Sequence, residues 1–169
     1  WRRNQHLVAR LLRDRPRLRV LFVEPSADPT YALARRRRPR VGRGLRRGPD
    51  LPGVGPDGSG RPRLWLHEPT KPLPRRVDAR ADDRLAASVS RAASLWINDP
   101  SVARMVRHTA WPALYDVTDD WARAVRGPAE TERLHTDEDL LLRRCEQVTV
   151  CSPQLARSKG PARTAHGLP

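Results

Sequence analysis

Acidic and amide side chains gather where two short apolar segments, 95–97 and 113–117, come to an end. They are Asn98, Asp99, Asp116, Asp119 and Asp120. A carboxylate in such a place can remove a proton from a hydroxyl, hold a sugar hydroxyl or bind a divalent cation. Aspartate is also common in turns that follow strands, so a purely structural role stays open for each of them.

Two other groups of residues could contribute to the same chemistry. Trp121 offers an apolar ring face on which a sugar can stack, although a half-buried position in the core is the simpler interpretation. Near the start of the chain, Asn4, Gln5 and His6 lie where a helix should begin, so they could bind an anion or sugar hydroxyls, or cap the helix. Asp99 directly precedes a proline and can likewise be a helix cap.

The hydrophobic pattern predicts that helices and strands alternate along the chain. Apolar residues at helical spacing predict helices at 1–15, from Asp82 or Asp83 to 94, at 101–108, at 128–146, and from Pro153 to a stop at Gly160. Short apolar runs predict strands at 19–23, 64–66, 95–97, 113–117 and 148–151. This order is typical of an α/β fold, a Rossmann-like parallel sheet with flanking helices and right-handed crossovers. We expect one domain over residues 1–160 and an irregular tail at 161–169.

The predicted topology says where the acidic residues should meet. The carboxyl ends of parallel strands lie at the same edge of a sheet, and ligands of open α/β sheets bind outside that edge. The sequence therefore predicts a candidate site built from the residues that follow the strands at 95–97 and 113–117.

Residues 26–63 differ in kind from the rest of the chain. Arg35–Arg38 is a block of four arginines, and glycine and proline recur through GRGLRRGPDLPGVGPDGSGRPR. Such a composition offers little apolar surface to offset the entropy of ordering, so we predict a long, largely disordered loop between two strands. The alternative is an arginine–glycine segment that binds nucleic acid, but Arg35–Arg63 contains no aromatic residue to stack on bases.

The composition limits the classes of partner. The net charge is +14, yet of the 33 basic residues only Lys71 and Lys159 are lysines. Nucleic-acid-binding surfaces usually mix lysine with arginine and interleave aromatics, so a GC-rich coding sequence explains the arginines better than nucleic-acid binding. The charge could also hold the chain against anionic lipid or an anionic sugar nucleotide. No apolar run approaches the ~20 residues that cross a bilayer, which favours a cytoplasmic protein.

Other familiar chemistries lack their sequence patterns. The chain contains neither G-x-G-x-x-G after a strand nor G-x-x-x-x-G-K-[ST], which disfavours an autonomous NAD or ATP enzyme, and it has no G-x-S-x-G nucleophile elbow. Cys145 and Cys151 are not spaced as zinc ligands, so we predict no metal site. Both cysteines are expected to be buried thiols, with a disulfide between them as the weaker alternative.

An ordered set of segments resembles the N-terminal domain of a bacterial group 1 glycosyltransferase with the GT-B fold. The segments are WRRNQHLVARLL, RVLFVEP, LWLHEPTKPLP, LWINDP, LYDVTDDW and CEQVTVCSPQLARSKG. Each alone is weakly specific, but together they cover most of the chain outside the arginine-rich loop. The resemblance ends at Gly160, and the chain begins at Trp1 rather than at a methionine. We therefore expect a truncated polypeptide that lacks the second, nucleotide-sugar-binding domain.

The resemblance implies a function for the predicted site. In that family the N-terminal domain binds the acceptor, which would be a glycan or lipid-linked molecule of the cell envelope, and transfer from the nucleotide-sugar is metal-independent. The catalytic candidates are then Asp119 and Asp120, and the acceptor-binding candidates are Asp116, Trp121, Asn98, Asp99, Asn4, Gln5 and His6.

The resemblance also implies what the fragment would lack. It would act on hexosyl donors only through the missing C-terminal domain, would bind no cofactor tightly and would be inactive alone. We expect it in the cytoplasm or at the inner face of the cell membrane. Two alternatives from other classes remain, an arginine-rich nucleic-acid-binding module and a non-catalytic interaction domain.

Overall fold

The computed structural model describes residues 3–24, 27, 29–70, 94–123 and 127–165. The chain divides into two compact units, Trp1–Asp78 and Ala79–Pro169, which we call unit 1 and unit 2. Each unit has its own three-stranded sheet and its own cluster of buried apolar residues. The grouping of residues 1–160 into a single domain therefore stays a prediction.

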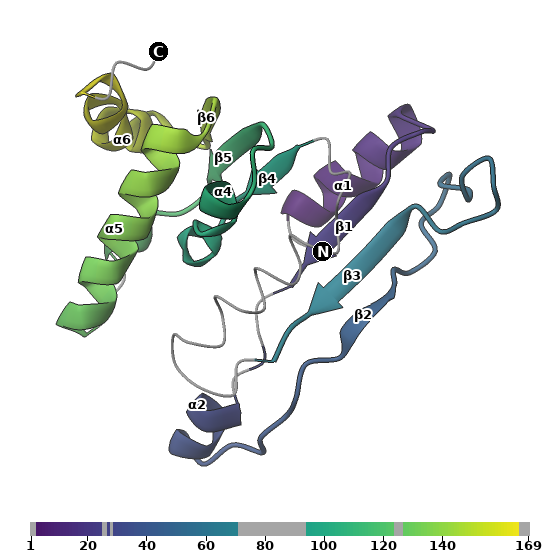
Figure 1. Ribbon diagram of the computed structural model, residues 1–169, viewed down its shortest axis with the longest axis horizontal. Coiled ribbons are helices and arrows are strands. Elements are labelled where there is room, and N and C mark those ends of the chain that lie inside the picture. Colours follow the sequence, from purple (N-terminus) through teal and green to yellow (C-terminus); the bar gives the residue numbers. More distant parts are fainter. Residues whose placement is uncertain (1–2, 25–26, 28, 71–93, 124–126, 166–169) are drawn as a thin grey trace. The chain divides into compact units, whose positions relative to one another are not determined.

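Unit 1 is a helix packed on a mixed sheet (Figure 1). Its elements are α1 (Arg3–Asp14), β1 (Val20–Val23), α2 (Pro29–Ala34), β2 (Gly44–Arg47) and β3 (Leu64–Glu68). The strand order is β1-β3-β2, with β1 parallel and β2 antiparallel to β3. Helix α1 buries one apolar stripe, formed by Val8, Ala9 and Leu12, and Leu51 from the segment between β2 and β3 completes this core.

The prediction of a largely disordered loop at 26–63 is wrong, because the structure places α2, β2 and several hydrogen-bonded turns within it. Hydrogen bonds and ion pairs hold this segment in place, since it has few apolar side chains to bury. The buried Arg63 guanidinium donates to the carbonyl oxygens of Leu12 (2.8 Å), Arg15 (3.1 Å) and Gly55 (2.9 Å), so it satisfies carbonyls at the end of α1 and ties them to the loop.

Two carboxylates anchor the rest of that segment. Asp57 Oδ1 accepts hydrogen bonds from the backbone N–H groups of Arg61 and Ser59, both at 2.9 Å. The N–H of Arg61 and the Ser59 side chain hold the pKa of Asp57 well below its ordinary value. At the end of β3, the buried Glu68 forms ion pairs with two arginines of the segment, and the side-chain hydrogen bond from Arg43 lowers its pKa.

The segment also passes very close to the end of β3. A Cβ added to Gly42 would lie 2.5 Å from the carbonyl oxygen of Pro69 and closer still to that of Glu68. The N–H of Gly42 donates to Thr70 Oγ1 at 2.8 Å. Only glycine allows this approach of one backbone to another.

Unit 2 is a parallel α/β layer. Its strands are β4 (Leu95–Ile97), β5 (Ala113–Val117) and β6 (Gln147–Val150), all parallel and in the order β4-β5-β6. Its helices are η1 (Pro100–Val102), α4 (Met105–His108), η2 (Trp121–Arg123), α5 (Pro128–Arg144) and α6 (Pro153–Ala165). This arrangement confirms the predicted α/β class with a parallel sheet and flanking helices.

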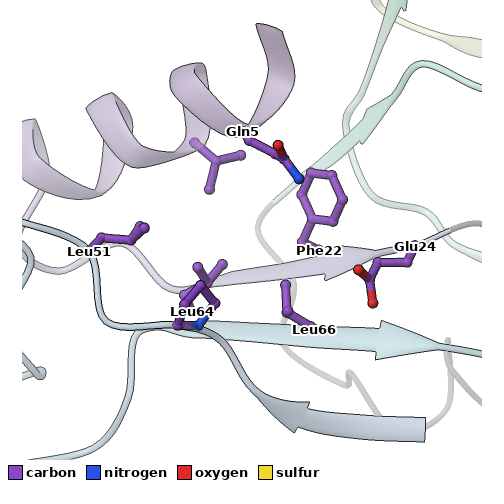
Figure 2. Close-up of a pocket in the computed structure, with 8 residues that line it drawn as sticks. Gln5, Phe22, Glu24, Leu51, Leu64 and Leu66 are labelled. Carbon is purple, nitrogen blue, oxygen red and sulfur yellow. The ribbon is translucent and has the colours of Figure 1, made fainter. Parts of the chain in front are cut away.

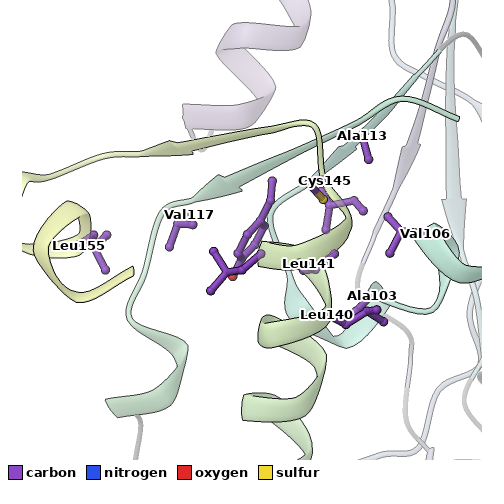
Figure 3. Packing of buried hydrophobic residues seen from close by; sticks show 11 residues of the cluster. Ala103, Val106, Ala113, Val117, Leu140, Leu141, Cys145 and Leu155 are labelled. Carbon is purple, nitrogen blue, oxygen red and sulfur yellow. The ribbon is translucent and has the colours of Figure 1, made fainter. Parts of the chain in front are cut away.

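The core of unit 2 lies between the sheet and its helices (Figure 3). Tyr115 and Val117 lie two residues apart in β5, so both point to the same face of the sheet. They belong to one buried cluster with Leu141 of α5 and with Cys145, which follows the end of that helix. All four are almost fully buried. Leu155 of α6 closes one end of this cluster.

Several local predictions need correction or stay open. Helix α6 does not stop at Gly160, because that glycine has a helical rather than a left-handed backbone, and the helix continues to Ala165 with Pro161 inside it. Cys145 is buried as predicted but Cys151 is exposed, because it lies just beyond β6, and both are free thiols. The helix predicted from Asp82 or Asp83 to 94 lies outside the described residues. Within the described chain, no helix is both long and apolar enough to cross a membrane.

Candidate functional site

The parallel strands of unit 2 deliver their following loops to one edge of the sheet. Strand β4 leads to Asn98 and Asp99, and β5 leads to the residues 118–120. The loop after β5 is joined to the one after β6, since the Cys151 N–H donates to the Val117 carbonyl oxygen at 3.2 Å. Cys151 Sγ also lies 3.2 Å from the Thr118 carbonyl oxygen. The sheet therefore brings together the strand-end residues that the sequence singled out.

Asp119 is the most accessible carboxylate of this edge. Its side chain is exposed, and Oδ2 accepts a hydrogen bond from Thr118 Oγ1 at 3.1 Å. Within the described residues, no arginine or lysine forms an ion pair with it. A carboxylate in this setting keeps most of its hydrogen-bonding capacity for an incoming hydroxyl.

Asp120 is held by two cations instead. Its carboxylate lies 3.4 Å from Lys159 Nζ and 3.3 Å from Arg123 Nε, and its side chain is only 25% exposed. The N–H of Arg123 also donates to the Asp120 carbonyl oxygen at 3.0 Å, which begins η2. Asp120 therefore fixes the shape of the loop that presents Asp119.

A buried polar network connects the loop 118–120 to the core of unit 2. Lys159 Nζ lies 2.7 Å from Glu138 Oε2, and the Tyr115 hydroxyl donates to Glu138 Oε1 at 3.1 Å. All three side chains are buried, and they come from α6, α5 and β5. Burial, followed by the Glu138 charge, raises the pKa of Tyr115 well above its ordinary value, so the phenol remains a donor. The Lys159 ammonium thus connects the core of unit 2 to Asp120.

Asp116 lies on the opposite face of β5 from Tyr115 and is almost fully buried. Its Oδ2 accepts a hydrogen bond from Trp96 Nε1 at 3.2 Å, and its Oδ1 accepts one from Thr149 Oγ1 at 3.1 Å. Thr149 is its register partner on β6. The carboxylate therefore joins all three strands, and this geometry favours a structural role over contact with an acceptor.

Local structure explains part of the role of the remaining candidate site residues of unit 2. Asp99 caps η1, because its side chain accepts a hydrogen bond from the Ser101 N–H at 2.9 Å while its backbone is extended. Asn98 is half-buried beside it. Trp121 is the first residue of η2 and is half-buried, as its alternative interpretation requires.

The other predicted residues belong to unit 1. Asn4, Gln5 and His6 lie in the first turn of α1, as predicted. Gln5 and Glu24 are the polar members of a pocket between α1 and the sheet that encloses about 180 Å³ and is otherwise lined by apolar side chains (Figure 2). The role of Asn4, Gln5 and His6 in acceptor binding stays a prediction.

Sequence reasoning missed the two central residues of the buried network. Glu138 lies in α5 between Leu134 and Leu141, four residues after the first and three before the second, so it occupies the apolar stripe of that helix. Lys159 is one of only two lysines in a chain whose other basic residues are arginines. A carboxylate in an apolar stripe and a rare lysine on the next helix were the available signals.

Within the described residues, no three His, Cys, Asp or Glu side chains come together as a group that could hold a metal ion. Comparisons with protein-family models, curated proteins and solved structures found no match to this chain.

Proposed function

We propose that this chain is the acceptor-binding, N-terminal part of a glycosyltransferase that transfers a sugar from a nucleotide-sugar to a glycan or lipid-linked acceptor. The observation that carries the proposal is the exposed Asp119 carboxylate at the carboxyl edge of a parallel sheet. The order of segments that resembles group 1 glycosyltransferases supports it further.

In the proposed reaction Asp119 is the general base. Its carboxylate accepts the proton of an acceptor hydroxyl while the hydroxyl oxygen forms a bond to the anomeric carbon of the donor. The bond between that carbon and the diphosphate oxygen breaks, and the nucleoside diphosphate leaves with the bonding electrons. Asp120, held by Lys159 and Arg123, positions the base rather than replacing it.

The donor would be bound by a second domain of the same enzyme. The described residues of this chain contain no glycine-rich phosphate loop of the kind that cradles a diphosphate. We therefore propose that the 169-residue chain holds no cofactor and binds nucleotide-sugars weakly. The acceptor hydroxyls would meet Asp119 and Asn98 of unit 2. For Asn4, Gln5 and His6 of unit 1, acceptor binding is a separate proposal. We place the chain, as part of the same proposal, in the cytoplasm or at the inner face of the cell membrane.

Isothermal titration calorimetry tests whether this chain binds the acceptor but not the nucleotide-sugar donor. We expect hexyl hexosides, as acceptor analogues, to bind with dissociation constants of about 1 mM, which corresponds to roughly 4 kcal/mol. UDP- and GDP-sugars should bind more weakly or not at all. Micromolar affinity for a nucleotide-sugar, with none for the hexosides, would contradict the proposal.

A further inference from the structure

The segment Leu33–Arg47, here called the arginine-rich segment, runs from the last turn of α2 to the end of β2 and is the most basic stretch of the molecule. It contains no acidic residue, and its eight arginines are Arg35, Arg36, Arg37, Arg38, Arg40, Arg43, Arg46 and Arg47. Most of its side chains are exposed. Its charge is therefore available to a partner outside unit 1.

The start of the segment has a defined backbone. The N–H of Arg36 donates to the Leu33 carbonyl oxygen at 2.9 Å, and that of Arg37 donates to the Ala32 carbonyl oxygen at 2.8 Å. Arg36 has a positive φ of 54°. These are the two hydrogen bonds and the left-handed residue of a helix C-terminal cap. The four-arginine block is consequently part of a capped turn with a defined backbone.

The segment carries more positive charge than unit 1 neutralises. Arg40 and Arg43 pair with Glu68, while Arg46 and Arg47 pair with Glu24 and Asp50, respectively. The pairs with Glu68 and Glu24 fasten the second half of the segment to the end of β3 and to the residue that follows β1, whereas the Arg47–Asp50 pair is local. Within the described residues, by contrast, the side chains 36–38 form no ion pair. Three guanidinium groups thus project from a turn whose base is anchored.

Aliphatic side chains are interleaved with these arginines. Leu33 is 61% exposed, Val41 is 70% exposed and Leu45 is 62% exposed, which are the highest values among the large hydrophobic residues of the described chain. A basic loop that only needs to stay solvated gains nothing from three exposed aliphatic residues. Together with the arginines they give the segment the mixed apolar and cationic character that suits the interface of an anionic bilayer.

We propose that the arginine-rich segment docks unit 1 onto an anionic lipid bilayer. The guanidinium groups of residues 36–38 would bind lipid phosphates, while Leu33, Val41 and Leu45 enter the boundary between headgroups and acyl chains. The absence of Phe, Tyr and Trp from residues 33–47 disfavours single-stranded nucleic acid, whose bases need aromatic partners. This inference is independent of the proposed function and would stand if no sugar were transferred.

Co-sedimentation of the 169-residue chain with vesicles tests the proposal. One set of vesicles is phosphatidylcholine alone, and the other contains about one third phosphatidylglycerol, enough to give the anionic surface on which the argument depends. We expect binding only to the anionic set, weakened by added salt. Substituting residues 36–38 by glutamine should weaken it about 100-fold, at roughly 5-fold for each charge near the surface.

Two further variants separate a specific surface from general charge. Replacing Leu33, Val41 and Leu45 by serine should weaken binding about 10-fold and leave its salt dependence intact, because only the inserted apolar area is lost. The matched control neutralises three exposed arginines elsewhere in unit 1, with an expected change of less than about 3-fold. These are Arg15, Arg17 and Arg61.

Three outcomes would overturn the proposal. The first is absence of binding to the anionic vesicles by the wild-type chain with a normal far-UV circular dichroism spectrum. The second is a control variant that loses as much affinity as the variant at 36–38. The third is tight, salt-sensitive binding of homopolymer RNA by a chain that leaves the vesicles unbound, which would assign the segment to nucleic acid.

Discussion

The buried ion pair of Lys159 with Glu138 should be essential to the stability of unit 2. Its Nζ–Oε2 distance is 2.7 Å, and the two side chains are only 10% and 7% exposed. Lys159→Met keeps the length and apolar stem of the side chain but removes its charge. The variant would leave the Glu138 carboxylate buried with the Tyr115 hydroxyl as its remaining partner.

The expected cost follows from that geometry. At 2.7 Å and an effective dielectric constant of about 20, the attraction of the pair is about 6 kcal/mol, much of which desolvation of the two charges cancels. Removing one partner leaves the other charge buried without compensation, so we expect Lys159→Met to lower the free energy of unfolding by about 3 kcal/mol. Glu138→Gln should cost about 2 kcal/mol, because Asp120 remains beside the lysine.

The double variant gives the sharper test. Because both single variants damage the same interaction, the double variant should cost about 3 kcal/mol rather than the sum, a coupling of about 2 kcal/mol. Urea unfolding of the 169-residue chain, followed by circular dichroism, measures all four forms of the cycle. A coupling below about 0.5 kcal/mol would mean that Lys159 and Glu138 do not stabilise unit 2 as a pair.

A matched control comes from the surface of the same helix. Arg143 Nη1 also lies 2.7 Å from a carboxylate oxygen, that of Asp139, but these side chains are 45% and 41% exposed. Arg143→Met should therefore change the free energy of unfolding by less than about 0.5 kcal/mol. Equal effects at the two sites would mean that burial does not set the strength of these pairs.

Three further predictions concern unit 1. Gly42→Ala should lower the free energy of unfolding by about 2 kcal/mol or more, because its Cβ would overlap backbone carbonyl oxygens, whereas Gly55→Ala meets nothing within 4 Å and should be neutral in the same urea titration. Arg36→Gly should raise stability by about 1 kcal/mol, since glycine accepts the positive φ of 54° without strain, and a lower urea midpoint would contradict this. Asp57 and Glu68 have pKa values that the fold lowers, so they stabilise unit 1 above their ordinary pKa of about 4, and this contribution is lost as the pH falls through the lowered values. Urea titrations at a series of acidic pH values should show this loss, and Asp57→Asn should flatten it.

The sequence predicted well those elements that depend on residues close to one another along the chain. Leu134, Leu141 and Cys145 recur at helical spacing, and all three are buried, the first two in α5 and the third at its C-cap. The alternation of strands and helices placed the strand-end aspartates at one edge of the sheet, because that rule needs only the chain order and the parallel direction.

The errors came from contacts between residues far apart in sequence. The segment 26–63 looked too polar to order itself, but Arg63 reaches back to α1 and binds the carbonyl oxygen of Leu12, 51 residues earlier. No local pattern reveals such a partner. The roles within the site were hidden for the same reason, since one of the two cations that distinguish Asp120 from Asp119 is Lys159, 39 residues farther along the chain.

We propose that Asp119 is the carboxylate that meets an acceptor hydroxyl. Titration of the isotope-labelled chain with hexyl hexosides, followed by two-dimensional NMR, locates the bound hexoside residue by residue. We expect amide shifts concentrated at 98–99 and 118–120, lost in Asp119→Asn and retained in Asp139→Asn, which alters a partly exposed carboxylate of α5. Shifts that avoid the strand ends, or that persist unchanged in Asp119→Asn, would contradict it.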